Sequence, residues 1–231
     1  MGVAEDSEKV LAGRRGAASH ERGFAVYARS TTFQARPEAI DEGIAFVQDE
    51  VMSTAMAMDG CVGLSMICDR ESGRCIATSA WSTQDAMTTS EQLMAPIRER
   101  GAEIFGSQPS VDRWEIAVLH RHAASGDGAC VRCTWLSLDA AGIDHAIETY
   151  RMAALPALEE MDGFCSASLM IDRATGRAVS SATFTSHDTM VASRPDAEAL
   201  RTRTAQDVGA SVTDIHEFEL ALAHLHVPEM A

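Results

Sequence analysis

Two carboxylates have the best placement in this chain for acid–base chemistry. Glu115 and Glu219 each follow an aromatic residue, Trp114 or Phe218, near the start of a predicted strand. Alternation along a strand puts small alanines on the same face as each carboxylate and bulkier side chains on the other face. We expect the bulkier face to lie under helices and the carboxylates to face an internal cavity. Burial there would raise a carboxyl pKa and produce a general base.

Two arginines offer partners for these carboxylates. Arg29 and Arg132 lie in the first predicted strand of each half of the chain, beside the strand that carries Glu115 or Glu219. We therefore predict charged pairs along the cavity wall, Arg29 with Glu115 and Arg132 with Glu219. The alternative is a structural ion pair or a solvated rim, because buried charges are also paired where no chemistry occurs.

Two His-x-His pairs could bind a metal ion. Residues i and i+2 of a strand point the same way, so His120 with His122, and His224 with His226, each present two imidazoles to one side. No Asp, Glu or Cys is evidently placed as a third ligand, and histidines at strand ends are usually solvated. We rank a metal site below the other hypotheses and expect no metal.

Trp81 and Phe184 end two matching predicted strands, where an aromatic ring either lines a ligand pocket or fills the core. With Arg29 and Arg132 they are the candidate ligand-binding residues. The six cysteines lie mainly in apolar strands and are interpreted as structural. The sequence has no Gly-x-Gly-x-x-Gly, P-loop, Gly-x-Ser-x-Gly or His-Glu-x-x-His motif, so we expect no cofactor.

These residues occur in pairs because the chain repeats itself once. Met58-Asp59-Gly60 recurs as Met161-Asp162-Gly163, a shift of 103 positions (161 minus 58), and this shift also aligns Trp81 with Phe184. Near the end of each copy the shift becomes 104 (219 minus 115). We expect a flexible N-terminal tail at 1–24, repeats at 25–122 and 129–227, and a linker at 123–128.

Each repeat reads as β-α-β-β-α-β. The expected elements of the first repeat are a strand at 26–33, a helix from Pro37 to Asp59-Gly60, hairpin strands at 61–68 and 74–81, a helix at 84–105 and a strand at 113–121. This is the order of a ferredoxin-like fold, with helices on one face of an antiparallel sheet. The open faces of the two sheets must cover each other. We therefore predict an α+β protein in which tandem ferredoxin-like repeats pack sheet to sheet as a pseudo-dimeric α+β barrel.

This pattern resembles a known superfamily, the dimeric α+β barrels. The helix-ending Met58-Asp59-Gly60, the hairpin and the aromatic Trp81 before Ser82-Thr83-Gln84-Asp85-Ala86-Met87 are most similar to the antibiotic biosynthesis monooxygenase (ABM) group, here as a tandem fusion. Members of that group include cofactor-independent monooxygenases that act on aromatic substrates and haem-degrading enzymes. The haem-degrading members use a histidine of the second helix as axial ligand. The helix at 84–105 has none and its copy has only His187 at its start, so haem is not expected.

Composition restricts the partners. Among 231 residues, 19 are basic and 34 acidic, for a formal net charge of -15, so nucleic acid and anionic membranes would be repelled. Residues 1–23 contain no apolar segment, so we expect no export signal and a cytoplasmic protein with reduced cysteines. The intramolecular pseudo-dimer needs no second chain, although a homo-oligomer is left open.

Together these features predict a protein that binds a small apolar or aromatic molecule in the cavity between the repeats, without evident catalytic apparatus. The alternative is a cofactor-independent monooxygenase or isomerase that uses Glu115 or Glu219. A metal-binding protein is the third hypothesis.

Overall fold

The structure is a computed structural model that describes residues 25–230. The predicted flexible tail, residues 1–24, lies outside the described residues, as does residue 231. Within the described part of the chain, no helix is both long and apolar enough to cross a membrane.

The first half of the chain has the predicted order of strands and helices. Its elements are β1 (Val26–Gln34), η1 (Pro37–Ala39), α1 (Ile40–Phe46), η2 (Val47–Val51), α2 (Met52–Met56), β2 (Cys61–Cys68), β3 (Arg74–Trp81), α3 (Gln84–Thr89), α4 (Glu91–Phe105) and β4 (Ser110–Arg121). The predicted second helix is divided at Ser90 into α3 and α4, and the closing strand begins at Ser110 rather than Arg113.

The same order of elements occurs a second time. These elements are β5 (Cys130–Ser137), η3 (Ala140–Gly142), α5 (Ile143–Thr149), η4 (Tyr150–Ala154), α6 (Leu155–Glu159), β6 (Phe164–Asp172), β7 (Arg177–Phe184), α7 (His187–Ala192), α8 (Arg194–Val208) and β8 (Ser211–Leu225). We call residues 25–122 the first half and residues 129–227 the second half. The duplication and its boundaries stay a prediction.

Local sequence explains where these elements begin and end. Pro37 occupies the first turn of η1, where its fixed φ suits a helix and its missing N–H is not needed. Thr83 caps α3, because its Oγ1 accepts a hydrogen bond from the Ala86 N–H at 3.0 Å. Gly60, just before β2, has a φ of 80°, and a Cβ there would lie 2.6 Å from the Ala86 Cβ, so a side chain would fit poorly.

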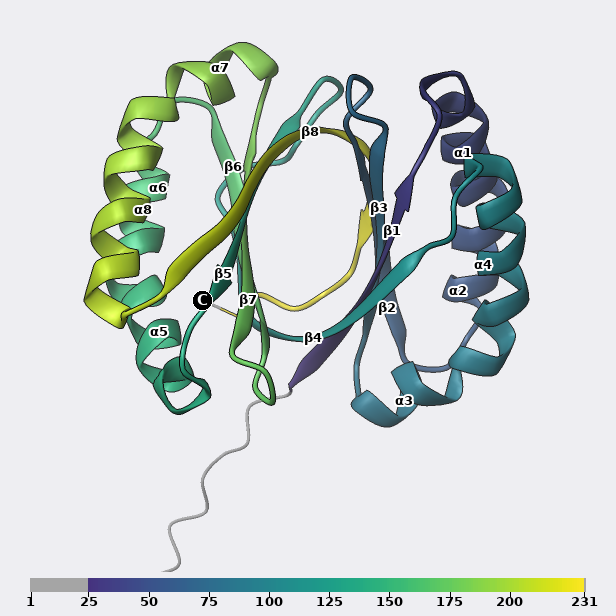
Figure 1. Ribbon diagram of the computed structural model, residues 1–231, viewed down its shortest axis with the longest axis horizontal. Helices are drawn as coiled ribbons and strands as arrows, with labels where there is room; N and C mark the ends of the chain where they lie inside the picture. The colour runs from purple at the N-terminus through teal and green to yellow at the C-terminus, as the bar shows by residue number, and fades with distance from the viewer. Residues whose placement is uncertain (1–24, 231) are drawn as a thin grey trace, which may run out of the picture.

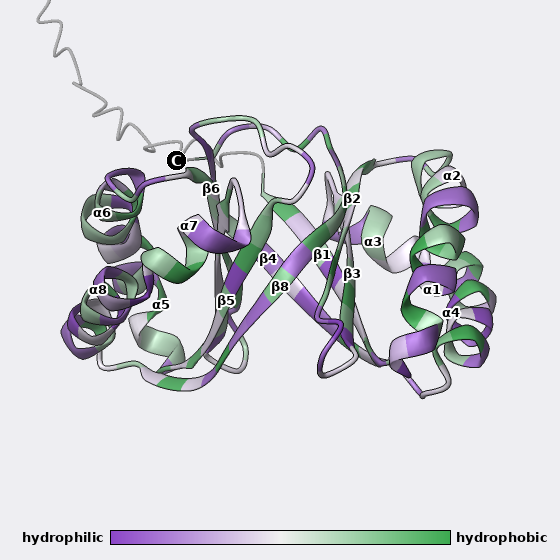
Figure 2. Cartoon of the chain, turned by 90° about the horizontal axis from the view of Figure 1, so that it is seen from above, coloured by the Kyte–Doolittle hydropathy of each residue, from purple (hydrophilic) through white to green (hydrophobic). Residues whose placement is uncertain are grey.

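The eight strands close into one barrel in the order β1-β3-β2-β8-β5-β7-β6-β4. Figure 1 shows this ring of strands with the helices on two opposite outer sides. The long strands β4 and β8 join the halves: β4 pairs with β1 and then with β6, and β8 pairs with β5 and then with β2. Figure 2 shows β4 and β8 crossing between the halves. The predicted barrel of two ferredoxin-like units is confirmed.

Both long strands contain a bulge where they pass between the halves. The pairing register of β4 slips between Ile116 and Val118, and that of β8 slips between Leu220 and Leu222. One extra residue reverses the alternation of side chains, so residues on either side of a bulge change face. On β4, Ile116 faces the barrel interior before the bulge, and Leu119 faces it afterwards.

Three apolar clusters form the core. One lies between the sheet and the helices of the first half and includes Phe105, and its counterpart in the second half includes Ile143. The third fills part of the barrel interior and includes Trp114 and Phe218. The barrel interior is therefore itself an apolar environment, to which both halves contribute.

Candidate functional site

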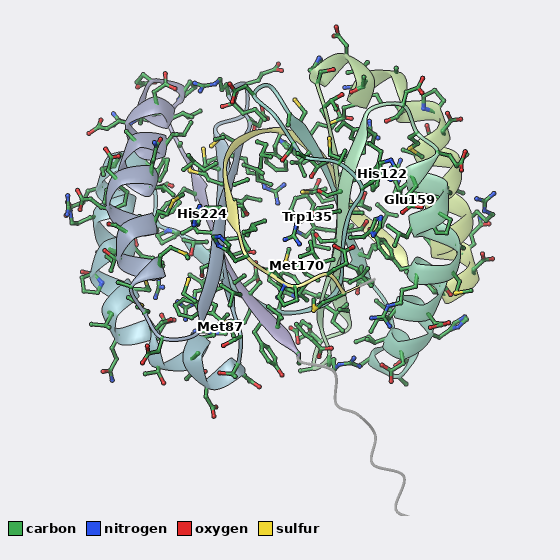
Figure 3. All side chains as sticks on the ribbon, turned by 180° about the vertical axis from the view of Figure 1, so that it is seen from behind. Met87, His122, Trp135, Glu159, Met170 and His224 are labelled. Atoms are coloured by element: carbon green, nitrogen blue, oxygen red, sulfur yellow. The ribbon has the colours of Figure 1, made fainter. Side chains whose placement is uncertain are left out.

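The barrel contains a cavity of about 450 Å³, which we call the lumen. Its wall combines aromatic, aliphatic and sulfur-containing side chains with small hydroxyl residues. The wall includes Trp114, Cys133, Trp135, Ser168 and Met170 together with the charged Arg74, Asp112 and Arg121. Figure 3 labels Trp135 and Met170 in the middle of the molecule, within the ring of strands. Residues of both halves line the lumen.

Arginines hold both lumen tryptophans. The Arg74 guanidinium lies 4.2 Å from the ring centroid of Trp135, and its Nη1 lies 2.6 Å from the Asp214 carboxylate. The Arg177 guanidinium lies 5.0 Å from the ring centroid of Trp114. These cation–π contacts keep the indole rings in place at the lumen wall.

One polar atom of a side chain that lines the lumen has no partner. Trp114 Nε1 is buried, and no atom among residues 25–230 accepts a hydrogen bond from it. A buried donor without an acceptor costs free energy, so a turn of the indole that brought its N–H to an oxygen atom of a ligand would be favoured. The other buried indole in the first half differs, because Trp81 Nε1 donates to Ser79 Oγ at 2.9 Å.

The prediction that Glu115 and Glu219 face the lumen is wrong. Trp114 lines the lumen, so its neighbour Glu115 points to the other side of β4, where Arg173 Nε approaches its Oε2 at 2.7 Å. Glu219 likewise pairs with Arg70, at 2.9 Å. The physical reason is that the barrel interior takes the bulky face of β4 and β8, with Trp114 and Phe218, so the carboxylates that alternate with them point outward.

Arg29 and Arg132 also lie elsewhere than predicted. Both are buried beneath the helices, at 2% and 6% exposure. Arg29 donates to the Met87 carbonyl and to Ser90 Oγ at the end of α3, and its carboxylate partner is Glu91 at 3.3 Å. Burial lowers the pKa of Arg29, and Glu91 opposes that effect. The predicted Arg29–Glu115 pair is therefore not formed.

Arg132 has the same position in the second half. It donates to the Met190 carbonyl and to Ser193 Oγ, and its Nη2 lies 2.9 Å from Glu217 Oε1. The predicted Arg132–Glu219 pair is not formed either, because Glu217 rather than Glu219 reaches the arginine. Both arginines tie the end of a short helix to the sheet.

Trp81 and Phe184 are fully buried on the helix side of the sheet. Ala80 lines the lumen, so Trp81, the next residue of β3, faces the helices. The guanidinium groups of Arg29 and Arg132 lie 5.8 and 5.6 Å from the Trp81 and Phe184 ring centroids. The structure thus places each of these arginines beside one of the two candidate aromatic residues, but outside the lumen.

The histidine pairs lie at the ends of the long strands. His120 and His122 converge with Glu159, the last residue of α6, so that one ligand atom from each lies within 4.8 Å of the others. The His224 and His226 rings pack against each other at 4.6 Å, and both side chains are exposed. Glu159 was missed in the sequence because it comes from a helix that follows β4 by many residues.

A second, smaller cavity lies between the sheet and the helices of the second half. It measures about 110 Å³, and its wall includes Tyr150, Ser180 and Val208. Ser180 Oγ donates a hydrogen bond to the Tyr150 hydroxyl at 3.3 Å, and burial raises the Tyr150 pKa to about 12. The equivalent space in the first half is only about 40 Å³.

The sequence did contain a signal for the lumen. Small hydroxyl residues alternate with other types on several strands, as in Ser30 and Thr32 on β1 or Ser181 and Thr183 on β7, and all four line the lumen. Such alternation marks one face of a strand. Trp135 and Met170 were missed because nothing in the local sequence distinguishes a lumen position from a helix-facing one.

Two relatives from Mycobacterium tuberculosis match nearly the whole chain. The uncharacterized protein Rv2557 is 54% identical over 210 residues, which cover 91% of this chain and 94% of the relative. The uncharacterized protein Rv2558 is 52% identical over 227 residues, which cover 96% of each chain. No family model matches the chain.

Solved structures share the fold at low sequence identity. A candidate monooxygenase from Lactobacillus acidophilus has a TM-score of 0.65 at 8% identity, with 87% of this chain and 97% of that chain covered. An anthrone oxidase-like protein has a TM-score of 0.59 at 13% identity, with 91% and 96% covered. A ferredoxin fold protein from Listeria monocytogenes, related to antibiotic biosynthesis monooxygenases, has a TM-score of 0.51 at 8% identity, with 85% and 96% covered. The predicted resemblance to ABM-like barrels is confirmed at the level of the fold.

Proposed function

The chain belongs to the family of the mycobacterial proteins Rv2557 and Rv2558, and we propose that it binds a small aromatic or other apolar molecule in its lumen. The volume of about 450 Å³ supports this proposal, because sites for small molecules generally measure about 300–1,000 Å³. Such sites combine an apolar wall with a few polar groups that orient the ligand. The lumen has this composition.

The observation that carries the proposal is the unpartnered Nε1 of Trp114. Once the indole turns its N–H to the lumen, an aromatic ligand with a hydroxyl or carbonyl oxygen can accept this hydrogen bond while its ring packs against apolar side chains of the wall. Trp135 provides a second aromatic surface for such a ring. The ligand class is therefore a small aromatic molecule with at least one oxygen acceptor.

The polar groups of the lumen favour binding over covalent catalysis. Cys133 lines the lumen, but burial raises its thiol pKa to about 11, so the thiol stays protonated near neutral pH and is a poor nucleophile. Asp112 also lines the lumen, and its Oδ1 lies 2.8 Å from Arg177 Nη2. This ion pair already uses one oxygen of the carboxylate.

The second candidate function is a cofactor-independent monooxygenase or isomerase. It is favoured by the presence of Asp112 in the lumen wall and by the fold that the chain shares with proteins named as monooxygenase and anthrone oxidase-like. Glu115 and Glu219 do not line the lumen, so Asp112 replaces them as the base in this alternative. Oxygen uptake with an anthrone that is lost in Asp112→Asn, while ligand binding persists, would establish it.

Isothermal titration with 1-naphthol, an aromatic ring with a single hydroxyl group, tests the proposal. Ser168→Trp places a large side chain in the lumen, and we expect at least tenfold weaker binding. Trp114→Phe keeps a ring but removes the N–H, and we expect about tenfold weaker binding, or ~1.4 kcal/mol.

The matched control is Val208→Phe, which fills the smaller cavity and should leave the affinity unchanged. Binding that survives Ser168→Trp and is lost in Val208→Phe contradicts a lumen site.

A further inference from the structure

The end of β4 brings two imidazoles and a carboxylate together outside the lumen. His120 and His122 project from the strand end, and Glu159 projects from the end of α6. Figure 3 shows His122 and Glu159 next to each other, between the barrel and the helices of the second half. We propose that these three residues bind a divalent transition-metal ion, with Zn²⁺ as the best match.

The bulge in β4 makes this arrangement. Leu119 and Arg121 line the lumen, so His120 and His122, which alternate with them, point outward to the side of α6. Without the bulge, this part of the strand would turn its histidines inward. The backbone thus presents both imidazoles to the helix that carries Glu159, and a pair of residues at i and i+2 can bind one ion together.

The geometry of His120 leaves a place for a cation. Both ring nitrogens are buried, and neither makes a hydrogen bond to any atom of residues 25–230. Nε2 nevertheless lies 2.5 Å from Glu159 Oε1, outside hydrogen-bond geometry. An imidazole nitrogen and a carboxylate oxygen this close, with no hydrogen bond between them, can become ligands of one cation.

A second carboxylate lies on the other side of the same ring. Glu229 Oε1 is 2.7 Å from His120 Nδ1, and the same oxygen accepts a hydrogen bond from the Arg121 N–H at 3.1 Å. Histidines that bind metals usually have an outer carboxylate beside the ring nitrogen that does not touch the ion, and this carboxylate orients the ring. Glu229 lies on that side of the ring.

The position of Glu159 also favours a cation. It is the final residue of α6, where the helix dipole places partial negative charge, so a carboxylate there is unfavourable without a positive partner. Two histidines and one glutamate are a ligand set that Zn²⁺ takes with a fourth position open to water. Ligand distances of about 2.0–2.2 Å would be reached by small side-chain adjustments, because the three ligand atoms already lie within 4.8 Å.

The second half provides an internal control. The predicted shift of 103 matches Glu159 with Met56 (159 minus 103), the last residue of α2. His224 and His226 repeat the strand-end pair, but within residues 25–230 they belong to no group of three metal-ligating side chains. A thioether in place of the carboxylate removes the charged oxygen ligand, so we expect no comparable Zn²⁺ site at this end.

Metal titration of the full chain, after chelation and under reducing conditions, tests the inference. We expect one Zn²⁺ per chain with a Kd of about 1 μM or lower, and Co²⁺ in its place should show the visible absorption of a low-coordinate site. Glu159→Met, which copies the other half, should weaken binding at least tenfold while circular dichroism stays native. The His224→Ala/His226→Ala double variant should bind as the wild type does, and Met56→Glu should add a second ion.

Three results would overturn the site. They are an absence of Zn²⁺ and Co²⁺ binding by the wild type, binding that is unchanged in Glu159→Met, and binding that is lost when His224 and His226 are replaced. The first of these would assign His120 to an ion pair with Glu159 and Glu229 instead. Since His120→Ala could disturb folding, the conservative Glu159→Met variant carries the test.

Discussion

The two halves of the barrel have the same order of elements but fill the space under their helices differently. In the first half, the Phe33 and Phe105 rings stack at 4.5 Å and Phe46 lies in the same cluster. The predicted shift matches Phe33 with Leu136, Phe46 with Thr149 and Phe105 with Val208. The space left is about 40 Å³ in the first half and about 110 Å³ in the second. Three side chains, rather than a change of fold, determine whether a half is packed or hollow.

Around the buried arginine, the positions of the acidic residue and of a second arginine are swapped between the two halves. The two sets are Arg29 with Glu91 and Arg113, and Arg132 with Glu217 and Arg194. The acidic residue lies on the helix in the first half and on the strand in the second, and the arginine that pairs with it is exchanged in the same way. What both halves keep is a carboxylate beside a buried guanidinium, because leaving that charge unpaired would be costly.

The largest difference between the halves should appear when their packing residues are truncated. Phe105 is fully buried, so Phe105→Ala should lower the free energy of unfolding by about 3–5 kcal/mol. Val208 lines a space that is already open, so Val208→Ala should cost at most about 1–2 kcal/mol. Urea unfolding of both variants measures this difference. Equal losses would show that the first half is not the more tightly packed one.

Removing the carboxylate beside the buried Arg132 should destabilise the protein less than Phe105→Ala does. Glu217→Gln removes the carboxylate next to Arg132, and we expect a loss of about 2–3 kcal/mol in the free energy of unfolding. The double variant Arg194→Glu/Glu217→Arg copies the order of the first half and should recover most of that loss. Urea unfolding compares the two. A double variant as unstable as Glu217→Gln would mean that the halves are not interchangeable at this position.

The same carboxylate predicts a dependence on pH. Burial raises the pKa of Glu217, but the hydrogen bonds from Arg194 and Arg132 outweigh it, so the pKa lies below its ordinary value of 4.5. A lowered folded-state pKa means that Glu217 contributes stability above the ordinary value, and that this contribution is lost as the pH falls through the lowered pKa. The Tm difference between wild type and Glu217→Gln should therefore shrink in acid. A difference that stays constant below pH 4.5 contradicts this assignment.

The smallest effect should come from filling the hollow half. Val208→Phe places the residue of the first half into the cavity of about 110 Å³. We expect a gain of about 0.5–1 kcal/mol in the free energy of unfolding, because the ring takes up unused space. A loss of stability would show that the cavity wall cannot adapt to the added ring.

The sequence predicts the local elements of this fold well. Pro37, Gly60 and the turn before Arg74 mark boundaries that depend on residues close together in the chain, and the structure has helices and strands at those places. The faces of β4 and β8 were not predictable in the same way. A bulge reverses the alternation partway along each strand, and alanines at 117 and 221 give no local sign of it.

Among the functional residues too, those set by neighbours in the chain were predictable and those set by distant contacts were not. The histidine pairs were found because both members lie on one strand, two residues apart. Glu159 was not found, since it meets His120 only through the pairing of β4 with β6 in the other half. Arg29 was paired with the wrong carboxylate for a related reason, because its partner Glu91 lies on a helix rather than on the neighbouring strand.

The position of a bound 1-naphthol ring in a crystal structure of the full chain tests the central claim, the lumen site, most directly. We expect the ring inside the barrel near Trp135, with the hydroxyl oxygen within hydrogen-bond distance of Trp114 Nε1. A ring found under the helices of the second half, against Tyr150 and Val208, would contradict the claim and assign ligand binding to the smaller cavity.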